Sequence, residues 1–248
     1  MQSSNLPAII LAAGRGERLR PHTDTTPKPL LPVRGKPLAQ WHLEALARAG
    51  VTRVVINTAW LEAQFEPAFG RGERFGVEIA YSHEGRDHGG ALETAGGIAK
   101  ALPLLGDAFW VVSGDVFVPG FRFDADHAQR FRSAQEILAR LWLVPNAPHH
   151  PKGDFGIDAG TGLATDVEGV PRLTWASIGL FRAEMFKDIA AGTKLALRPL
   201  LDAAMRAGTL AAERWDGAWT DVGTLERWQA LNASAPDAPL DTSRPYSA

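Results

Sequence analysis

Two basic residues lie in segments whose composition suits phosphate binding. Arg15 stands between two glycines directly after an apolar run, and Lys28 stands between two prolines. Glycines after a buried strand let backbone N–H groups approach phosphate oxygens, and prolines restrict the backbone of the lysine. The two cations can stabilise the charge that develops on a transferred phosphate. This pattern predicts a phosphate-binding loop.

Two acidic residues add metal chemistry. Asp115 directly follows the apolar run 109–113, where open α/β sheets bind their ligands, and Asp221 lies far along the chain. Two carboxylates from distant segments suit Mg²⁺, which binds few protein oxygens together with phosphate oxygens and water. Taken singly, Asp115 is more simply a turn residue and Asp221 a helix cap. Together with the basic loop, the pair favours a shared magnesium site.

Particular residues exclude two common classes of glycine-rich nucleotide-binding loop. A dinucleotide-binding loop has a third small residue where this chain has Leu19, and an acidic ribose ligand where the second apolar run ends at Asn57. A P-loop ends in Gly-Lys-Ser/Thr, which does not follow Gly16. The loop therefore belongs to another class of nucleotide site, or is a plain turn between a strand and a helix.

The elements that must position these residues alternate along the chain. Short apolar runs bounded by turn residues predict strands, and apolar residues at helical spacing predict helices. Strands are expected at 8–13, 51–57, 77–81, 109–113, 137–144 and 176–181. Helices are expected at 38–49, 61–69, 94–105, 194–207 and 225–233. This alternation predicts an α/β fold with a mostly parallel (mixed) central sheet and helices on both faces.

Composition excludes several classes of protein. The 248 residues are 45% hydrophobic and carry a formal net charge of -2, so no global attraction to nucleic acid or to a membrane surface is expected. The chain has no cysteine, which excludes disulfides and thiolate metal sites. No apolar stretch is long enough to span a membrane, and the run 6–13 lacks a signal-peptide cleavage site. We expect a cytoplasmic protein.

The N-terminal loop carries a long family signature. Residues 11–29 match the pattern L-A-A-G-x-G-x-R-x-x-P-x-T followed by P-K-P. In this the chain resembles the sugar-1-phosphate nucleotidyltransferases, which have a Rossmann-like nucleotidyltransferase fold and join a sugar 1-phosphate to the α-phosphate of a nucleoside triphosphate. The resemblance implies that the triphosphate is held by Leu11, Ala12, Ala13, Gly14 and Gly16.

The same resemblance implies catalytic roles for four charged residues. Arg15 and Lys28 match family residues that stabilise the reacting phosphates. Asp115 and Asp221 match the aspartates of G-D and W-x-D-x-G-T, which bind the catalytic Mg²⁺. One departure is Ser113, where many relatives have asparagine. The expected partners are therefore a nucleoside triphosphate and a sugar 1-phosphate, with Mg²⁺ as the cofactor.

The segment 91–97 matches the base-recognition segment of the family, L-x-T-A-G in many members. Thr94 and neighbouring backbone groups can read the base edge, while Gly96 and Gly97 can permit close approach of the nucleotide. A helix N-terminus with Thr94 as its cap explains the same residues. Both interpretations can hold at once.

The sugar side departs from the wider family. Many relatives carry Glu-Lys-Pro, whose lysine contacts the sugar phosphate, whereas this chain has Glu168-Gly169-Val170. Lys152 and Arg172 are candidates to replace the missing cation. No motif determines which of them does so.

Shorter motifs resemble one branch of the family, the uridylyltransferases of cell-wall recycling that act on N-acetylmuramate α-1-phosphate. They include residues 92–94 and the loop 146–155, whose adjacent histidines are expected at the surface or against the sugar. The expected reaction is transfer of UMP from UTP to that sugar phosphate. A guanylyltransferase acting on mannose or heptose 1-phosphate and a non-catalytic nucleotide-sugar-binding module are the alternatives. Sugar contacts are expected from Asn146, Lys152, Asp154 and Gly156.

The pattern along the chain predicts a single domain. No internal repeat or hexapeptide β-helix period is present. We expect one nucleotidyltransferase domain over 1–233, with a nucleotide-binding half at about 1–115 and a sugar-binding half at about 116–233. The tail 234–248 is rich in Pro, Asp and Ser and is expected to be flexible.

Overall fold

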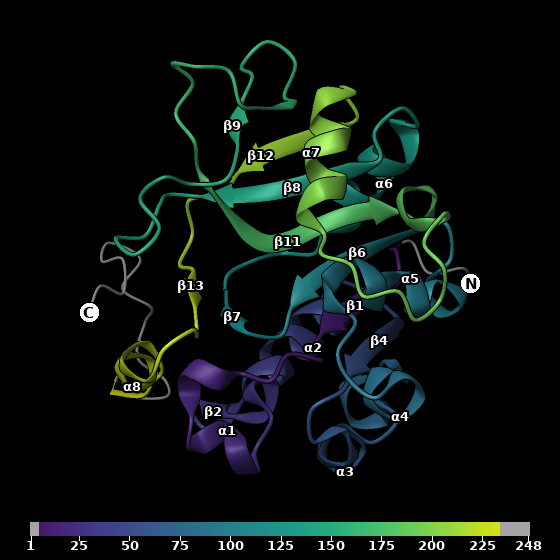
Figure 1. Ribbon diagram of the computed structural model, residues 1–248, viewed down its shortest axis with the longest axis vertical. Coiled ribbons are helices and arrows are strands. Elements are labelled where there is room, and N and C mark those ends of the chain that lie inside the picture. The colour runs from purple at the N-terminus through teal and green to yellow at the C-terminus, as the bar shows by residue number, and fades with distance from the viewer. Residues whose placement is uncertain (1–4, 234–248) are drawn as a thin grey trace.

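A seven-stranded sheet forms the centre of the protein (Figure 1). The computed structural model describes residues 5–233. The strands lie in the order β12-β8-β11-β6-β1-β4-β5. They are β1 (Ala8–Leu11), β4 (Arg53–Thr58), β5 (Glu78–His83), β6 (Ala108–Ser113), β8 (Ala139–Val144), β11 (Thr174–Arg182) and β12 (Leu210–Arg214). One sheet therefore runs through both predicted halves of the chain.

The directions of the strands make the sheet mixed, as predicted. β1 pairs in parallel with β4 and β6, and β4 pairs in parallel with β5. β11 runs antiparallel to β6 and β8, and β12 pairs in parallel with β8. Because β1, β4 and β6 are parallel, their carboxyl ends meet at one edge of the sheet. The residues that follow these strands can therefore form a common ligand site.

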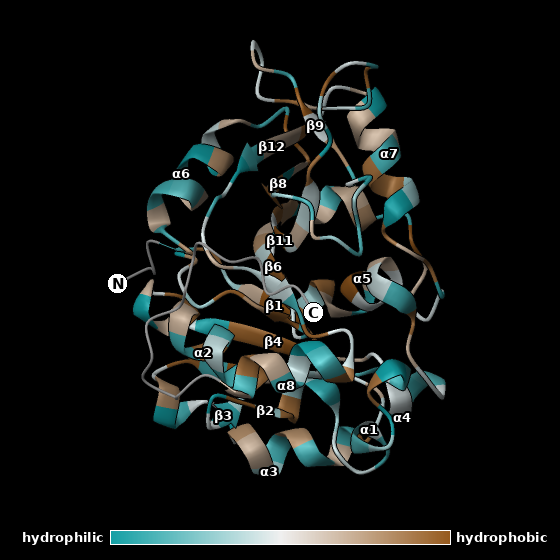
Figure 2. Ribbon diagram, turned by 90° about the vertical axis from the view of Figure 1, so that its left-hand side faces the viewer, coloured by the Kyte–Doolittle hydropathy of each residue, from teal (hydrophilic) through white to brown (hydrophobic). Residues whose placement is uncertain are grey.

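Helices cover both faces of the sheet, which confirms the predicted α/β fold. Successive residues of a strand point to opposite faces, so Ile10 of β1 joins one buried core and Ile9 joins the other. The strands supply the apolar centre of the molecule, as the brown ribbon of β4 illustrates (Figure 2). The first core packs against α2 (Leu38–Arg48), α3 (Phe65–Phe69) and α6 (Ala125–Ser133), and the second against α5 (Glu93–Leu105) and α7 (Arg198–Arg206).

Two of the larger elements, β12 and α6, were not predicted, and the helices predicted at 61–69 and 194–207 are shorter than predicted, as α3 and α7. β12 reads Leu-Ala-Ala-Glu-Arg, whose alanines and charges have low strand propensity, and its pairing with β8 supplies the stability. α6 is mostly polar, with only Ala128 and Phe131 buried. α7 begins at Arg198 rather than at residue 194, because Pro199 fits the first turn of a helix. Residues 194–197 form a loop instead.

The remaining elements are mostly short. The helix predicted at 225–233 is confirmed as α8 (Leu225–Ala233). Two other short helices are α1 (His22–Thr25) and α4 (Glu84–His88). Small antiparallel pairs are formed by β2 (Pro32–Val33) with β3 (Lys36–Pro37) and by β9 (Gly156–Ile157) with β10 (Ala164–Thr165).

A two-stranded ladder ties a late segment of the chain to the centre of the sheet. β7 (Val116–Phe117) follows β6 and pairs antiparallel with β13 (Thr220–Asp221), as Figure 1 shows. Asp221 lies opposite Val116, and the Val222 N–H donates to the Asp115 carbonyl oxygen at 2.8 Å. The ladder therefore brings both predicted metal-binding aspartates to the same edge of the sheet.

Within residues 5–233, no helix combines the length and the apolar character needed to cross a bilayer. The predicted flexible tail, 234–248, lies outside the described residues. The division of the domain near residue 115 stays a prediction.

Candidate active site

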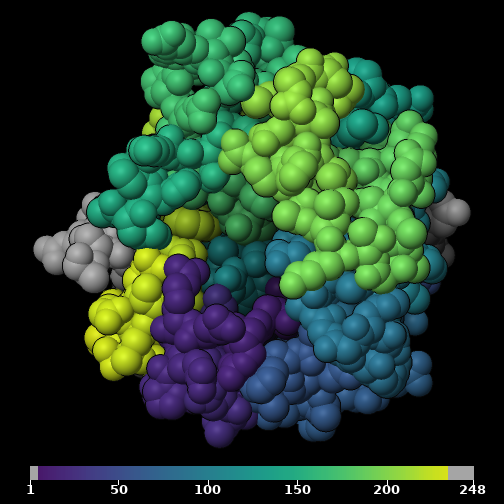
Figure 3. Space-filling model, viewed as in Figure 1, coloured from purple at the N-terminus to yellow at the C-terminus, as the bar shows by residue number. Residues whose placement is uncertain are grey.

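A cavity opens where β1 and β6 end. Its volume is about 460 Å³, and Figure 3 shows the hollow between the N-terminal segment in purple and the light-green segment around residue 190. Three of the four charged residues that were predicted to be catalytic, Arg15, Lys28 and Asp115, line it, whereas Asp221 does not. Its lining also includes six of the predicted nucleotide-binding residues, Leu11, Ala12, Ala13, Gly14, Gly16 and Thr94.

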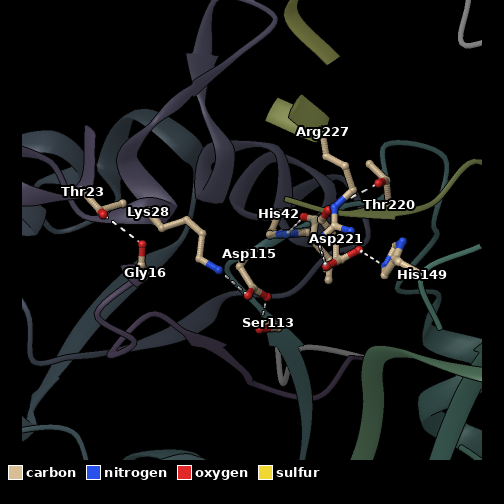
Figure 4. Close-up of polar contacts among 11 residues, drawn as sticks. Gly16, Thr23, Lys28, His42, Ser113, Asp115, His149, Thr220, Asp221 and Arg227 are labelled. Atoms are coloured by element: carbon tan, nitrogen blue, oxygen red, sulfur yellow. Dashed lines mark hydrogen bonds and ion pairs between the residues drawn. The ribbon is translucent and has the colours of Figure 1, made fainter. Parts of the chain in front are cut away.

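Lys28 and Asp115 form an ion pair in this cavity. Lys28 Nζ lies 2.8 Å from Asp115 Oδ2, and the Ser113 hydroxyl donates to Asp115 Oδ1 at 2.7 Å (Figure 4). Burial raises the pKa of the Asp115 carboxyl, but the charge of Lys28, the two hydrogen bonds and the charge of Arg18 outweigh burial and hold the pKa below its usual value. The carboxylate is therefore ionised at neutral pH, as a metal ligand must be.

Lys28 is also part of the fold. Only 11% of its side chain is exposed. It begins the 3-10 turn Lys28–Leu30, and the flanking prolines fix the backbone of this turn. A buried ammonium needs a partner, and Asp115 provides it across the cavity. The pair therefore stabilises the protein as well as placing a cation at the site.

Asp221 lies on β13, and its carboxylate contacts two side chains, those of Arg227 and His149 (Figure 4). Its Oδ2 pairs with Arg227 Nη2 at 2.9 Å, and Arg227, from α8, is only 7% exposed. His149 Nε2 lies 3.0 Å from Oδ1. That oxygen is buried but accepts no hydrogen bond of good geometry, so it keeps lone pairs for another ligand. Gly223 leaves room for the pair, because a Cβ there would lie 2.2 Å from Arg227 Nη2 and 2.5 Å from Asp221 Oδ2 and would displace these side chains.

A buried histidine supports the strand between the two aspartates. His42 of α2 is 2% exposed, and its Nε2 lies 2.9 Å from the Val116 carbonyl oxygen (Figure 4). A carbonyl oxygen only accepts, so Nε2 carries the proton. Burial lowers the pKa of His42 from 6.5 to about 4, although the Val116 hydrogen bond and the Asp115 charge act in the opposite direction. Neutral His42 therefore anchors β7 at neutral pH.

Arg15 is held in place by its own loop and by an aromatic ring. Its guanidinium donates to the Thr23 carbonyl at 2.8 Å and to Asp24 Oδ1 at 2.7 Å, and it stacks 3.7 Å from the centre of the Trp60 ring. The hydrogen bond from Arg15, together with the hydrogen bond and charge of Arg20, holds the pKa of Asp24 below its usual value, although burial acts in the opposite direction. Arg15 therefore lines the cavity as a fixed cation rather than a mobile one.

Gly96 and Gly97, both predicted to approach the nucleotide, are not among the residues that line the cavity. Both are buried in α5. A Cβ at Gly96 would lie 2.1 Å from the Thr193 carbonyl oxygen, and a Cβ at Gly97 would lie 2.4 Å from Glu84 Oε1. Their small size is therefore explained by packing between protein segments, and nucleotide contact by them stays a prediction.

The four predicted sugar-binding residues lie outside the cavity lining. Asn146 uses its amide to hold its own loop, donating to the Pro151 and Arg172 carbonyls at 3.1 and 2.9 Å. Asp154 Oδ2 accepts from the Trp175 N–H at 2.8 Å. Gly156 is packed against β10, and Lys152 is exposed in a turn. Their contact with a sugar stays a prediction.

Lys194, Asn57 and His149 are among the residues at the site that sequence reasoning did not assign to it. Lys194 lines the cavity from the loop 194–197, where a helix was expected, so no motif marked it. Asn57 lines the cavity from the end of β4. His149 approaches Asp221, although its loop was expected only to lie at the surface or against the sugar. The position of Asn57 at the end of a predicted strand was the available clue for that residue.

Comparison with known proteins assigns the family. The family model for Nucleotidyl transferase matches residues 7–237. The chain is 49% identical over 233 residues to the N-acetylmuramate alpha-1-phosphate uridylyltransferase of Neisseria meningitidis, covering 92% of this chain and 97% of that protein. It is 30% identical to the UTP--glucose-1-phosphate uridylyltransferase of Synechocystis, covering 90% of this chain and 62% of that protein.

A solved structure supports the fold. A Bacillus anthracis protein, provisionally assigned as a glucose-1-phosphate thymidylyltransferase, superposes with a TM-score of 0.77 at 23% identity. The match covers 97% of this chain and 98% of that one. The fold is thus consistent with the family that the sequence matches assign. The same chain carries the basic loop after β1 and the two predicted metal-binding aspartates. The chain belongs to the nucleotidyl transferase family and is a sugar-1-phosphate nucleotidyltransferase.

Proposed function

We propose that this enzyme transfers UMP from UTP to N-acetylmuramate α-1-phosphate, releasing pyrophosphate, as a step of peptidoglycan recycling in the cytoplasm. The observation that carries the proposal is the 49% identity to the Neisseria meningitidis enzyme over 97% of that enzyme's length. Three cations in the lining of the cavity, Arg15, Lys28 and Lys194, support binding of phosphorylated substrates beside the carboxylates of Glu17, Glu93 and Asp115.

The reaction needs no covalent intermediate. An oxygen of the sugar 1-phosphate attacks the α-phosphorus of UTP, the bond from that phosphorus to the bridging oxygen breaks, and pyrophosphate leaves with the electron pair. The nucleophile is already an anion, so no general base has to remove a proton. The protein's task is therefore to position the substrates and to neutralise charge. Lys28 and Arg15 supply fixed cations for the phosphates.

The two aspartates fit a magnesium ion. Residues 5–233 contain no group of three or more His, Cys, Asp or Glu side chains arranged to hold a metal. Mg²⁺ needs no such group, because substrate phosphates and waters complete its coordination. Asp115 is ionised, and Asp221 Oδ1 is buried without a good hydrogen bond. We propose that these two carboxylates hold Mg²⁺, which when bound would polarise the phosphate oxygens.

Pyrophosphate release across a matrix of triphosphates and sugar phosphates tests the proposed substrates. UTP with N-acetylmuramate α-1-phosphate is expected to give the highest kcat/KM. If GTP with mannose or heptose 1-phosphate gave a much higher kcat/KM, the guanylyltransferase alternative would replace the proposal. Absence of turnover with every pair would favour the non-catalytic alternative.

A magnesium titration of two variants tests the shared metal site. Asp115→Asn and Asp221→Asn each remove one ligand of the same ion, so their effects on turnover should be strongly non-additive in the double variant. Independent, multiplicative losses with unchanged magnesium dependence would contradict a shared site.

A further inference from the structure

A buried chain of hydrogen bonds links two segments that border the cavity. The Ala12 N–H donates to Asn57 Oδ1 at 2.8 Å. Asn57 Nδ2 donates to Glu84 Oε1 at 2.6 Å, and the Leu92 N–H donates to Glu84 Oε2 at 2.7 Å. Asn57 ends β4 and Glu84 begins α4. Three hydrogen bonds thus join the glycine loop to the predicted base-recognition segment.

The polarity of these bonds has one solution. The backbone N–H groups of Ala12 and Leu92 can only donate, so the atoms that face them must accept. The Asn57 amide therefore directs its NH₂ group to Glu84, and both oxygens of Glu84 accept. A neutral glutamine in place of Glu84 would put one donor opposite another donor. The carboxylate is thus required by the hydrogen-bond pattern.

Glu84 is an unusual residue to bury. It is 0% exposed and Asn57 is 3% exposed, and Glu84 has no ion pair within residues 5–233. Burial raises the pKa of its carboxyl, while the hydrogen bonds from Leu92 and Asn57 act against the rise. A buried carboxylate is costly for stability. The two hydrogen bonds that Glu84 accepts connect segments at the border of the cavity, and this connection offsets the cost.

The segment that Glu84 holds has a strained backbone. Glu93 has a φ of 62°, in the left-handed region that side chains disfavour. The preceding residue is clamped on both sides, because the Leu92 N–H donates to Glu84 and the Leu92 carbonyl accepts from the Leu195 N–H at 2.9 Å. Strain of this kind persists where the surroundings over-determine the conformation. Glu93 and Thr94 line the cavity directly after the clamp.

Gly97 of helix α5 leaves space for the side chains of Asn57 and Glu84. A Cβ at Gly97 would lie 2.4 Å from Glu84 Oε1 and 2.8 Å from Asn57 Nδ2. Any side chain at this position would therefore push the two groups out of hydrogen-bond geometry. The glycine is explained by the pair.

We propose that Asn57 and Glu84 act as a positioning relay, which sets the distance between the glycine loop and the segment 91–94 and thereby the affinity and base selectivity of the enzyme for the nucleoside triphosphate. Asn57 lines the cavity, whereas Glu84 acts through Asn57 and Leu92. The inference rests on the proposed function, in which this cavity takes the nucleotide.

A charge exchange within the pair tests the relay. Glu84→Gln alone puts two donors face to face, and Asn57→Asp alone puts two carboxylates face to face. In the double variant Asn57→Asp/Glu84→Gln every bond can form again: the new carboxylate accepts from Ala12 and from the new amide, whose oxygen accepts from Leu92. Independent structural effects would add in the double variant, whereas a relay is restored.

Steady-state kinetics give the first readout. Each single variant is expected to raise the KM for UTP about tenfold and to reduce the UTP-over-GTP ratio of kcat/KM, because a buried donor or acceptor is left unpaired. The KM for the sugar phosphate is expected to change less than about twofold. The double variant should return to within about threefold of the original protein. Glu62→Gln, which alters another partly buried carboxylate near α4, is the matched control and should leave these values unchanged.

Amide hydrogen exchange gives a readout that does not depend on turnover. Exchange at the Ala12 and Leu92 amides should accelerate in each single variant and slow again in the double variant. Unchanged KM values and base selectivity in folded single variants, or a double variant worse than either single one, would overturn the relay. If no substrate pair gives turnover in the original protein, the proposed function fails, and restored exchange protection then still decides whether the relay exists.

Discussion

The Lys28–Asp115 pair offers a perturbation whose effects on stability and on activity can be separated. Lys28→Met keeps most of the aliphatic stem and removes the ammonium group. Asp115 then keeps the Ser113 hydroxyl but loses the cation 2.8 Å away. The change therefore leaves a partly buried carboxylate without its ion-pair partner.

The size of the stability loss follows from the exposure of the two side chains. Removing one partner of a fully buried pair costs about 3–5 kcal/mol, whereas exposed pairs contribute about 0–1 kcal/mol. Lys28 has 11% of its side chain exposed and Asp115 has 35%, so the pair lies between these limits. We expect Lys28→Met to lower the free energy of unfolding by roughly 2 kcal/mol. An exposed phosphate-binding cation without an ion-pair partner would contribute almost nothing to stability.

Turnover should fall by far more than the stability loss explains. Removing one preorganised charge from a transition-state site costs about 10²–10³-fold in kcat, and the variant should still be folded at the assay temperature. Urea unfolding measures the first effect and pyrophosphate release the second.

The matched control is Lys36→Met. Lys36 also pairs with a partly buried carboxylate, that of Glu44, and lies over the Trp41 ring, but it is not among the residues that line the cavity. This control should lose stability and keep turnover. A folded Lys28→Met protein with turnover within about threefold of the original would refute the catalytic role of the lysine.

Three further predictions concern single residues. Because burial lowers the pKa of His42 from 6.5 to about 4, its contribution to stability is present above pH 6.5 and is lost as the pH falls toward 4. Between pH 7 and 4.5 the protein should therefore lose about 2 kcal/mol more unfolding free energy than the His42→Gln variant. Equal losses for the two proteins in urea titrations would contradict this. Asp221→Asn should lower the unfolding free energy by about 1–3 kcal/mol because buried Arg227 loses its anionic partner. It should nearly abolish turnover, whereas a mild effect on turnover would indicate a capping role. Lys194→Ala should raise the KM for a phosphorylated substrate with little change in melting temperature, and an unchanged KM for both substrates would exclude Lys194 from binding.

The site could be predicted from the sequence where local motifs carry it. The glycine loop follows a buried strand, and Asp115 follows another, so their meeting at the carboxyl ends of β1 and β6 follows from parallel pairing. The strong apolar character of those strands also made their positions clear. Local pattern and tertiary position agree here.

Other features depend on contacts that no local pattern shows. A long connection, residues 145–173, separates β8 from β11, so no local pattern indicates that β11 runs antiparallel to its neighbour. β12 is held by its neighbour rather than by its own alanine-rich sequence. Glu84 looks like a surface residue of a polar segment, yet it is fully buried and accepts hydrogen bonds from Asn57 and Leu92. These features arise from tertiary packing, which overrides the propensity of short segments.

The ladder between β7 and β13 has a consequence for biosynthesis. All seven strands of the sheet precede Asp221 in the chain. A nascent chain can therefore assemble the sheet and bring Lys28 to Asp115 while Asp221 is still inside the ribosome. The proposed metal site closes only after β13 has emerged and paired with β7. On the proposed metal site, catalytic competence is acquired at a late stage of synthesis, and a chain that ends before β13 would lack it.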